Sequence, residues 1–431
     1  MIFRRSATLL LLLVALLPSP AAAQQADDTT VETALLDILL ERGIISAEEH
    51  EELLALARAR VDEQRGEIDL VEARLARLRA PDVQASGGAP GKLVFKSPDG
   101  TWSLGLKGLV QARVEVDESD DDTQDDTNFS VPRARIEAYG ISGTPDTTYE
   151  VELDMGTNKD ADNPAEGRDA KLEKAFMNWA FSQYAAFRFG QFKVPFGREE
   201  QISTGSLQFQ ERSIANKEFA PSYEPGAMVH GKLLEDELTW QVAVNNGEGS
   251  TFNNTAGDTE NGLREAVRVT WSPLGAVALD GPAFPTLDDG AVRVIVGAAF
   301  MHNDDSAELN TATPSSESSS RGLEAQLFAG PFSLLAEHFT RRTDAEGVPD
   351  VTDRGSTLQA GLFVFGEAWE VIARDADVNF DTEDDSHENA VGVNWYRARH
   401  AGKWMMDFSW LRNDGDTADA HRSRLMYQLL F

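Results

Sequence analysis

Residues 102–116 read WSLGLKGLVQARVEV, and the alternation in this stretch decides the fold class. Most even positions, from Trp102 to Val116, hold apolar residues, whereas the odd positions hold mainly polar ones such as Lys107 and Arg113. Successive side chains of a β-strand point to opposite faces of its sheet. The stretch therefore predicts a strand with one apolar face and one polar face.

The same alternation recurs from residue 92 to the end of the chain in segments of roughly ten residues, which is the pattern of membrane β-barrels. Sixteen candidate strands start near residues 101, 129, 147, 171, 186, 226, 237, 263, 290, 321, 331, 355, 367, 388, 401 and 422. An even number of strands brings both ends of a barrel to the same side of the membrane, as in bacterial barrels. We therefore predict an all-β transmembrane barrel of about 16 antiparallel strands.

The connections between these strands are alternately short and long. Most of the short ones are tight turns, and residues 275–289 form the one long connection on the short side. The long polar connections cover residues 117–128, 158–169, 197–225, 247–262 and 303–320. Outer-membrane barrels place long loops outside the cell and short turns in the periplasm. The asymmetry therefore predicts a bacterial outer-membrane location.

The third outward loop, residues 197–225, is unusually long for a connection inside a compact domain, and such loops tend to be functional. It lies between a predicted strand at Phe187–Pro195 and another at Ala227–Leu234. Two interpretations stay open: a long surface loop, or a plug folded into a hollow structure. The alternating pattern in the rest of the chain argues for something hollow.

The aromatic residues indicate a membrane interface. All eight Trp residues fall on the apolar parity of their strands, and seven of them lie near the short-turn ends, with Trp410 as the exception. Aromatic residues gather where a membrane protein meets the water boundary. Phe431 ends the last strand, and a terminal aromatic residue of this kind is the usual signal for barrel insertion.

The chain begins with a predicted secretory signal peptide at residues 1–23. Arg4 and Arg5 form its positive start, an apolar run follows, and three alanines at residues 21–23 form a small-residue cleavage site. That run is too short to cross a bilayer as a helix. No later segment holds eighteen consecutive apolar residues, so we expect no transmembrane helix in the mature chain.

Residues 24–91 predict an α-helical arm in the periplasm, and residues 92–431 form the barrel domain. Ser46 and Glu49 have the spacing of a capping box at a helix start, and 3-4 spacing of apolar residues from Leu54 indicates a short coiled coil. A Gly- and Pro-rich linker ends the arm. The arm is either an amphipathic helix lying on its own protein or a helical bundle that associates subunits.

The composition excludes several classes of function. The formal net charge is −33 with a pI of about 4.5, which argues against nucleic acid as a partner. No cysteine is present, so no disulfide or thiolate metal site can form. We identify no catalytic motif, no metal motif and no cofactor. The acidic loops at residues 118–126 and 381–385 lack the pattern of a calcium loop, and we interpret them as solvated. Divalent cations that bridge lipopolysaccharide phosphates are the alternative.

Several segments resemble the phosphate-selective porin O/P family. The likeness covers most of the mature chain and is firmest in residues 92–245. The matching segments are SPDGTWSLGLKGLVQAR (97–113), PRARIEAYG (132–140), FRFGQFKVPFG (187–197), FQERSIA (209–215), PGAMVHGKL (225–233) and VGVNWY (391–396). The resemblance implies a homotrimer of sixteen-stranded barrels, a third loop folded into each pore, and uptake of phosphate or related anions.

Charged strand positions must face the lumen, because a charge on the lipid face costs about 2–4 kcal/mol at mid-bilayer. Arginines favour anions in a pore and match phosphate oxygens with paired N–H groups. We predict an anion path formed by strand and loop bases: Arg113, Arg133, Arg135, Arg198, Arg212 and Lys217. The loop departs from a strongly anion-selective pattern, because its five acids outnumber its three bases.

Other interpretations remain. Arginines and glutamates on neighbouring strands can simply pair to keep a water-filled lumen neutral, which gives a general porin without phosphate selectivity. The barrel can also serve as an envelope anchor that the arm ties to the cell wall. A hydrolase would need Ser, His and Asp or Asn to meet at the barrel wall. We predict a channel without enzymatic activity, with small anions and outer-membrane lipid, including lipopolysaccharide, as partners.

Overall fold

A computed structural model gives the structure of the protein. It describes residues 40–41, 43, 46–52, 54–55, 93–119, 126–156, 170–247, 262–277, 290–305, 316–345, 347–415 and 419–431. The chain divides into two compact units, residues 1–81 and residues 82–431. The predicted signal peptide, the coiled-coil segment, the linker and most of the acidic loop at residues 118–126 lie outside the described residues.

The described part of the first unit contains a helix start. The hydroxyl of Ser46 accepts a hydrogen bond from the backbone N–H of Glu49 at 3.2 Å, and the Glu49 carboxylate accepts one from the backbone N–H of Ser46 at 2.8 Å. This reciprocal pair is the capping box expected from the sequence. Among the described residues, no helix is long and apolar enough to cross a membrane.

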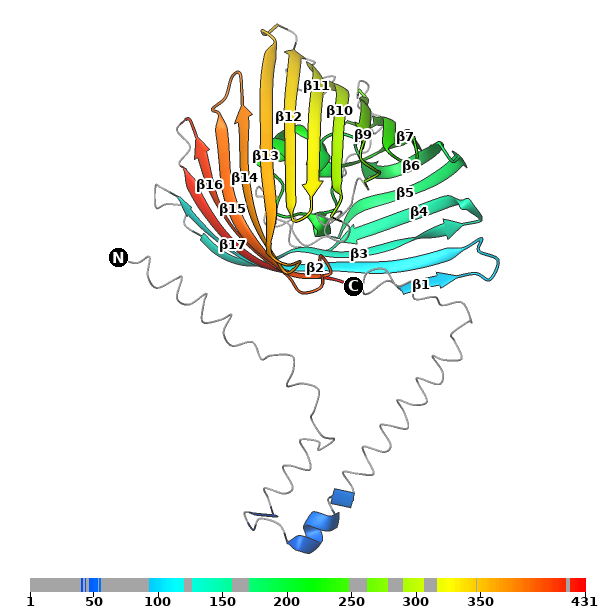
Figure 1. Ribbon diagram of the computed structural model, residues 1–431, viewed down its shortest axis with the longest axis vertical. Helices are drawn as coiled ribbons and strands as arrows, with labels where there is room; N and C mark the ends of the chain where they lie inside the picture. The colour runs from blue at the N-terminus through cyan, green and yellow to red at the C-terminus, as the bar shows by residue number, and fades with distance from the viewer. Residues whose placement is uncertain are drawn as a thin grey trace. The chain divides into compact units, whose positions relative to one another are not determined.

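The second unit is a barrel (Figure 1). Its described strands pair with their neighbours in antiparallel order, and one short strand, β1, precedes the sixteen that form the wall. They are β1 (Leu93–Lys96), β2 (Ser103–Ser119), β3 (Asp126–Ser142), β4 (Thr144–Asp154), β5 (Lys171–Ser182), β6 (Ala185–Lys193), β7 (Tyr223–Leu233), β8 (Leu238–Asn245), β9 (Arg264–Trp271), β10 (Val292–Asp305), β11 (Ser316–Ala329), β12 (Phe332–Ala345), β13 (Val351–Phe365), β14 (Trp369–Asn379), β15 (Ser386–Tyr396), β16 (Gly402–Asn413) and β17 (Ala420–Leu430).

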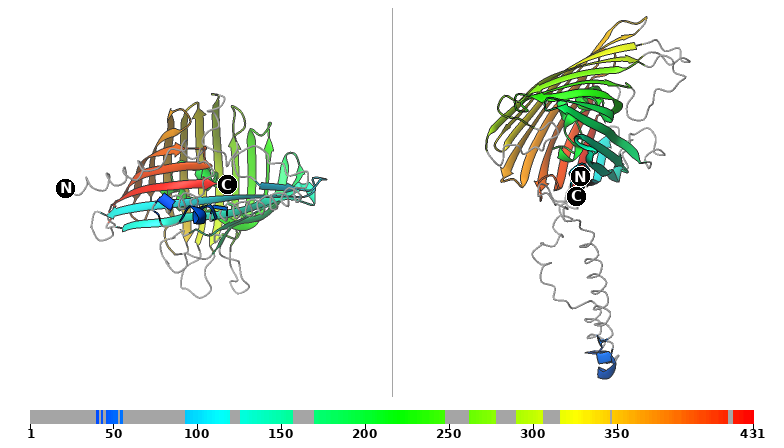
Figure 2. Two further views of the ribbon diagram at one scale, coloured as in Figure 1. Left: turned by 90° about the horizontal axis from the view of Figure 1, so that it is seen from below. Right: turned by 90° about the vertical axis from the view of Figure 1, so that its right-hand side faces the viewer.

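The last strand closes the sheet on the first strand of the wall. β17 pairs with β2 over a register that runs from Ala420 opposite Ser119 to Leu430 opposite Leu109. Figure 2 shows the resulting ring of tilted strands from two further directions. The predicted closed barrel of sixteen antiparallel strands is therefore confirmed, and closure leaves its wall strands without an unpaired edge.

β1 is the element that the alternation pattern did not predict. Its four residues pair with β2 from Leu93 opposite Leu106 to Lys96 opposite Ser103, next to the place where β17 ends. Gly108 exchanges two backbone hydrogen bonds with Phe431, of 2.5 and 3.0 Å. A Cβ atom on Gly108 would lie 2.6 Å from the Phe431 ring. Glycine at this position therefore leaves room for the Phe431 ring.

The two faces of the wall have opposite chemistry. Outward side chains such as Val110, Leu153 and Val391 are apolar and exposed, with 46% of the Val391 surface accessible. Inward positions hold polar groups, and Glu137 and Arg268 are nearly inaccessible there. This is the reverse of a soluble protein, in which apolar side chains fill the centre. Lipid is the solvent that suits such an outer surface.

An aromatic row crosses the outer face of four neighbouring strands. Trp369 of β14 lies opposite Trp395 of β15, which lies opposite Trp404 of β16, which in turn lies opposite Tyr427 of β17. The Trp369 and Trp395 rings stack with centroids 5.8 Å apart, and those of Trp404 and Tyr427 are 4.8 Å apart. All four lie near the short-turn ends, as expected for one membrane interface.

We expect a charge on the outer face of β15 to destabilise the barrel. Val391→Arg should lower the free energy of unfolding in lipid vesicles by about 2–4 kcal/mol, because the guanidinium replaces a valine that faces acyl chains. Urea titration followed by tryptophan fluorescence measures this change. Val348→Arg, at an exposed position between β12 and β13, is the control and should change the free energy by less than about 0.5 kcal/mol. Equal effects of the two variants would contradict the assignment of the outer face.

Candidate functional site

Residues 194–222, which connect β6 to β7, lie against the inner wall of the barrel, and we call them the inner loop. They contain α4 (Arg198–Gln201), the 3-10 helix η2 (Thr204–Ser206) and α5 (Ile214–Phe219). Figure 1 shows these helices in green, enclosed by the curve of the strands. Val194, Phe196 and Ala215 have no accessible surface. The predicted third outward loop is therefore folded inward.

Apolar side chains attach the inner loop to the wall at three places. The Phe196 and Phe219 rings each lie with their centroids 5.7 Å from that of Phe339 on β12. Leu207 packs on Leu335, also on β12. The third place joins Phe209 to Ile372 and Ala390, on β14 and β15. These contacts make a dry region between the loop and β12–β15 inside an otherwise polar lumen.

Wall carboxylates cap the two α-helices of the loop. Glu337 of β12 accepts hydrogen bonds from the backbone N–H groups of Arg198 and Glu199, the latter at 3.0 Å. Glu388 of β15 accepts one from the N–H of Ile214 at 3.1 Å. The first N–H groups of a helix have no partner inside the helix and carry partial positive charge. Inward carboxylates on the wall therefore fix where each short helix begins.

Every acid of the predicted loop is neutralised by an arginine. The pairs are Glu199 with Arg374 (3.3 Å), Glu200 with Arg212 (3.0 Å), Glu211 with Arg133 (2.6 Å) and Arg113 (2.8 Å), Glu218 with Arg341 (2.8 Å), and Glu224 with Arg264. All of these arginines except Arg212 come from wall strands. The surplus of acids in the loop therefore serves to attach it to the wall, and its negative charge is cancelled there.

Two of the predicted anion-path residues converge on one of these acids. Arg113 of β2 and Arg133 of β3 each bind one oxygen of the Glu211 carboxylate. Burial alone would raise the pKa of Glu211, but the charges of Arg133, Lys217 and Arg113 hold that pKa well below its usual range. Glu211 therefore stays ionised as the common partner of both arginines.

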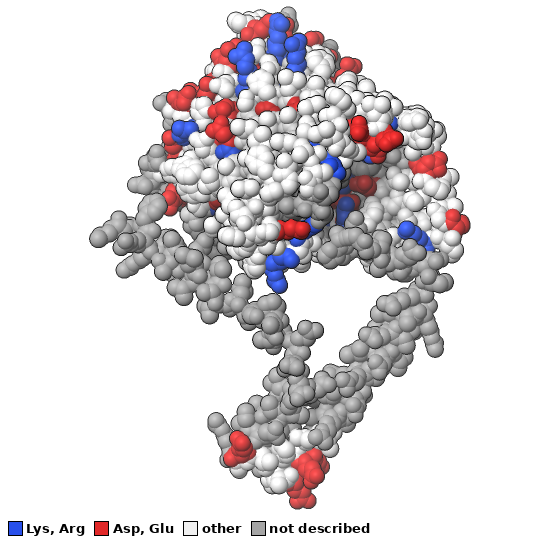
Figure 3. All heavy atoms as spheres, viewed as in Figure 1, with Lys and Arg blue, Asp and Glu red and all other residues white. Residues whose placement is uncertain are grey.

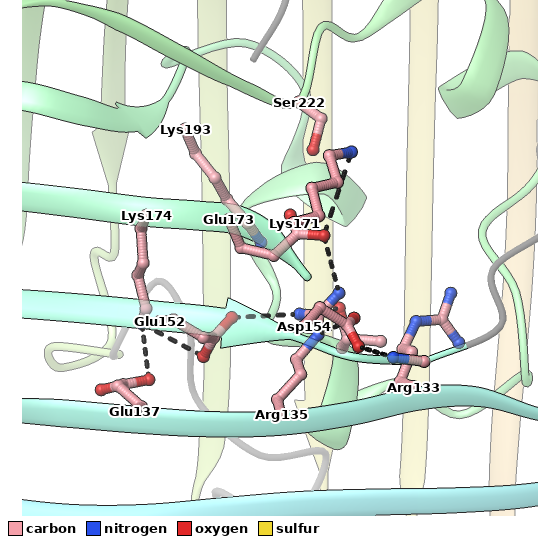
Figure 4. Close-up of polar contacts among 12 residues, drawn as sticks. Arg133, Arg135, Glu137, Glu152, Asp154, Lys171, Glu173, Lys174, Lys193 and Ser222 are labelled. Carbon is pink, nitrogen blue, oxygen red and sulfur yellow. Dashed lines mark hydrogen bonds and ion pairs between the residues drawn. The ribbon is translucent and has the colours of Figure 1, made fainter. Parts of the chain in front are cut away.

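Arg135 is the centre of a separate network on β3, β4 and β5 (Figure 4). Its guanidinium contacts Asp154 at 2.7 Å, Glu152 at 3.2 Å and Glu173 at 3.5 Å. In the same network Lys174 contacts Glu137 at 2.8 Å and Glu150 at 2.9 Å. Acids and bases thus alternate across these strands. Such alternation cancels charge on the wall, as the neutral-lumen interpretation expects.

The three predicted loop bases have different environments. Arg198 is 1% exposed and donates to Gln326 at 2.7 Å. Arg212 donates to the backbone carbonyls of Glu199 and Ile202, at 3.3 and 3.1 Å, and so holds the loop together. Lys217 on α5 is exposed, and within the described part of the chain it forms no ion pair. Among the six predicted residues, Lys217 is the one whose side chain is exposed, and its charge also acts on Glu211.

Pairing across strands extends to the rest of the described wall. The arginines at the junction of β17 and β2 also have acidic partners. Arg422 contacts Asp117, and Arg424 contacts Asp407, each at 2.6 Å. Lys107 of β2 likewise contacts Glu137 at 2.6 Å. The lumen is therefore lined mainly by ion pairs.

Sequence reasoning did not identify the residues that hold η2 near the short-turn ends. Lys403 of β16, which is fully buried, donates to the carbonyl of Leu207 at 2.6 Å. Asn394 donates to the carbonyl of Gln208 at 2.9 Å, and Gln428 donates to that of Gly205 at 2.8 Å. These three residues occupy ordinary inward positions of their strands. Only their distant partners in the loop distinguish them, so no local signal could have found them.

Two Ser–His contacts lie on the outer face. His338 contacts Ser356 at 2.9 Å, and His302 contacts Ser319 at 3.2 Å, in both cases through the Nδ1 atom. In the part of the chain that the structure describes, no acid or amide contacts the second ring nitrogen of either histidine. The described residues also contain no group of three or more acids and histidines that could hold a metal ion.

Comparison with known proteins agrees with this architecture. A sequence model of the phosphate-selective porin O and P family matches residues 104–431. An uncharacterized protein of Aquifex aeolicus is 24% identical over 287 residues, which cover 61% of this chain and 68% of that protein.

Solved structures show the same fold. An anion-selective porin from Comamonas acidovorans superposes with a TM-score of 0.55 at 12% identity, covering 77% of this chain and 100% of that one. The trimer form of OmpT, an outer-membrane protein of Vibrio cholerae, gives a TM-score of 0.52 at 9% identity, again covering 77% and 100%. At these identities the likeness concerns the fold.

We expect the Glu211 contact to control attachment of the inner loop. Glu211→Gln removes the charge that Arg113 and Arg133 share. Arg133 then has no ion pair among the described residues, and Arg113 keeps only Glu115, at 3.6 Å. Loss of one partner of a buried pair is strongly destabilising. Trypsin cleavage after Arg212 or Lys217 in the folded barrel should therefore become at least about tenfold faster, corresponding to 1.4 kcal/mol or more.

Glu218→Gln is the matched control, because Glu218 belongs to the same loop but forms a more exposed pair with Arg341. Exposed pairs contribute about 0–1 kcal/mol, so the cleavage rate should rise by less than about fivefold. If both variants gave the same rate as the unmodified protein, the proposed role of Glu211 in attachment would be wrong.

Proposed function

Because this chain belongs to the phosphate-selective porin O and P family and is an outer-membrane porin, we propose that it gives small anions a passive, weakly selective route across the outer membrane. The solutes are phosphate, polyphosphate and anions of similar size. The route passes the inner loop, and the third outward loop at residues 197–225 narrows the lumen.

The observation that carries this proposal is the charge pattern of the inner loop. Its acids are bound to arginines, whereas Lys217 is exposed inside the barrel and has no ion pair in the described residues. An anion that passes the loop therefore meets a positive charge and no free carboxylate of the loop. Positive side chains at a narrow point of a pore favour anions over cations.

Weak selectivity follows from the remaining arginines. Arg113 and Arg133 have 14% and 7% of their side-chain surfaces exposed, and Glu211 already binds both. Arg113 also lies 3.6 Å from Glu115, and a phosphate ion that displaced Glu211 from Arg113 would leave that carboxylate with Arg133 alone. Arg113 and Lys217 therefore attract anions at short range, and the bound acid limits how tightly they hold them.

The extensive pairing of wall charges favours a second candidate, a general porin without preference for phosphate. A wall lined by paired acids and bases keeps a wide channel wet and nearly neutral. In that case only the size of a solute decides its passage. The two candidates differ in one property, the sign and size of the ion preference.

Assembly and placement complete the proposal. We propose a homotrimer with residues 24–91 in the periplasm after removal of residues 1–23. The trimer form of the Vibrio cholerae protein, which shares the fold, supports this assembly. Sedimentation of the detergent-solubilised protein tests it.

Reversal of the Lys217 charge should move the ion preference toward cations. A unit charge about 6 Å from a passing ion contributes about 0.7 kcal/mol in water, or about threefold in permeability. Lys217→Glu changes the charge by two units, which should lower anion permeability about tenfold and raise cation permeability about tenfold, so the anion-to-cation permeability ratio should fall by about a hundredfold. Reversal potentials in a KCl gradient across planar bilayers measure this ratio, and Lys96→Glu on β1 should leave it unchanged. An unaltered ratio in Lys217→Glu would favour the general porin.

Removal of the inner loop tests the narrowing separately. Replacement of residues 203–221 by a short Gly-Ser linker should raise single-channel conductance at least about twofold, because the free lumen of a sixteen-stranded barrel is wide enough for an aqueous channel. Circular dichroism and resistance to cold sodium dodecyl sulfate establish that the barrel still folds. An unchanged conductance in a folded variant would show that the loop does not narrow the path.

A further inference from the structure

A groove of about 340 Å³ lies on the outer face of the barrel, across β9, β10 and β11. Ala298 forms its floor, because this small side chain stands between larger outward neighbours. Val267, Phe300, Leu323 and Arg321 form its sides. In the strand register, Phe300 lies opposite both Val267 and Arg321, and Ala298 lies opposite Leu323. The groove is thus apolar except for the guanidinium at one end.

Arg321 stands at the level where the apolar band ends. On β11 the outward residues between Arg321 and the short turn are Leu323, Ala325, Leu327 and Ala329. Barrel strands rise about 2.5 Å per residue along the membrane normal, so Arg321 lies about 20 Å above Ala329. The apolar band of such barrels is about 25 Å tall with aromatic residues at its edges. The exposed Phe300 beside Arg321 fits that outer edge.

Further arginines extend this positive charge along the outer face. Arg321, Thr340 and Arg354 lie side by side on β11, β12 and β13, and Arg342 is the next outward residue of β12. Arg321 and Arg354 are exposed and make no ion pair among the described residues, whereas Arg342 contacts Asp350. Figure 3 shows Lys and Arg side chains over the upper ends of these strands, with Asp and Glu side chains among them. Free cations at this level contrast with the net charge of −33.

We propose that this groove binds one lipid of the outer leaflet whose headgroup carries phosphate. One acyl chain lies over Ala298 between Phe300 and Leu323, and the headgroup phosphate accepts hydrogen bonds from Arg321. Arg354 attracts a second phosphate or a neighbouring headgroup. This site faces the membrane and is separate from the lumen, so it does not depend on which solute the barrel passes.

Three features favour a lipid over a protein partner. The groove continues the apolar band without a break, so acyl chains are already the adjacent solvent. Its polar end is a single guanidinium, which binds phosphate through paired N–H groups. The guanidinium lies at headgroup depth, where a lipid phosphate is available to pair with it, so no carboxylate of a partner protein is needed. Shape, charge and depth therefore fit one molecule.

Native mass spectrometry of the full detergent-solubilised protein tests the site. The probes are phosphatidic acid and phosphatidylcholine, each with two 16-carbon chains, and inorganic phosphate. The unmodified protein should retain phosphatidic acid in preference to phosphatidylcholine. Arg321→Gln should weaken the binding of phosphatidic acid about tenfold, since the charged contact with phosphate is lost. Ala298→Leu should weaken it to a similar extent by filling the floor of the groove.

Arg412→Gln is the matched control, because Arg412 is an outward arginine of β16 whose guanidinium donates to Asn389 at 2.8 Å. This variant should bind phosphatidic acid like the unmodified protein. All three variants should keep the single-channel conductance, because their side chains lie outside the lumen. That measurement separates loss of the lipid site from failure to fold, and it also separates this inference from the proposed anion path.

Phosphatidic acid with two 6-carbon chains tests whether contact between an acyl chain and the groove contributes to binding. It should bind more weakly than the 16-carbon lipid in the unmodified protein and be almost insensitive to Ala298→Leu. The proposal is overturned if Arg321→Gln and Ala298→Leu both bind the long-chain lipid normally, which is the result expected when a second copy of the chain covers this face. It is also overturned if inorganic phosphate displaces the lipid at equal concentration, since binding would then not use the groove.

Discussion

Inside a lipid bilayer, every backbone N–H and C=O group must find its hydrogen-bond partner within the protein, and this requirement governs the structure. Water cannot satisfy an open strand edge inside a bilayer, so a sheet that crosses it has to close on itself. Here the closure is made by β17 against β2, and Phe431 adds a final pair of hydrogen bonds with Gly108. Once the wall is closed, the alternation of each strand sends apolar side chains to the lipid and polar ones inward. The interior is therefore polar by necessity, before any solute is considered.

A polar interior creates a second requirement, because charges in a confined lumen need partners. The wall meets it with ion pairs between neighbouring strands, and the inner loop meets it by bringing acids to wall arginines. Glu211 between Arg113 and Arg133 is the clearest example. The same pairing attaches the loop and reduces the net field in the lumen. A porin built in this way can favour one sign of ion only through the few charges left over, of which Lys217 is the foremost in the described loop.

Much of this architecture could be predicted from the sequence, because the period of the strands is local information. Residues 102–116 alone show the two faces of β2, and the positions of Trp369, Trp395 and Trp404 mark one interface. β1 escaped prediction because four residues are too few to display a period. The wall residues that hold the inner loop could not be predicted for a different reason. Nothing near Glu337 in the sequence indicates that it will cap a helix of a loop more than a hundred residues away. Nothing near Lys403 indicates that it will donate a hydrogen bond to a backbone carbonyl of that loop.

The small size of β1 has a mechanical consequence. Only four residue pairs, from Leu93–Leu106 to Lys96–Ser103, join it to β2 in a hairpin arrangement. Tension on the chain ahead of Leu93 would act on these pairs one after another, starting with Leu93–Leu106 at the end away from the hairpin turn. The longer β17–β2 seam, sheared along its whole length at once, would resist far more force. Under tension, β1 would thus separate from β2 first, and the pairing of β17 with β2 that closes the barrel would stay intact.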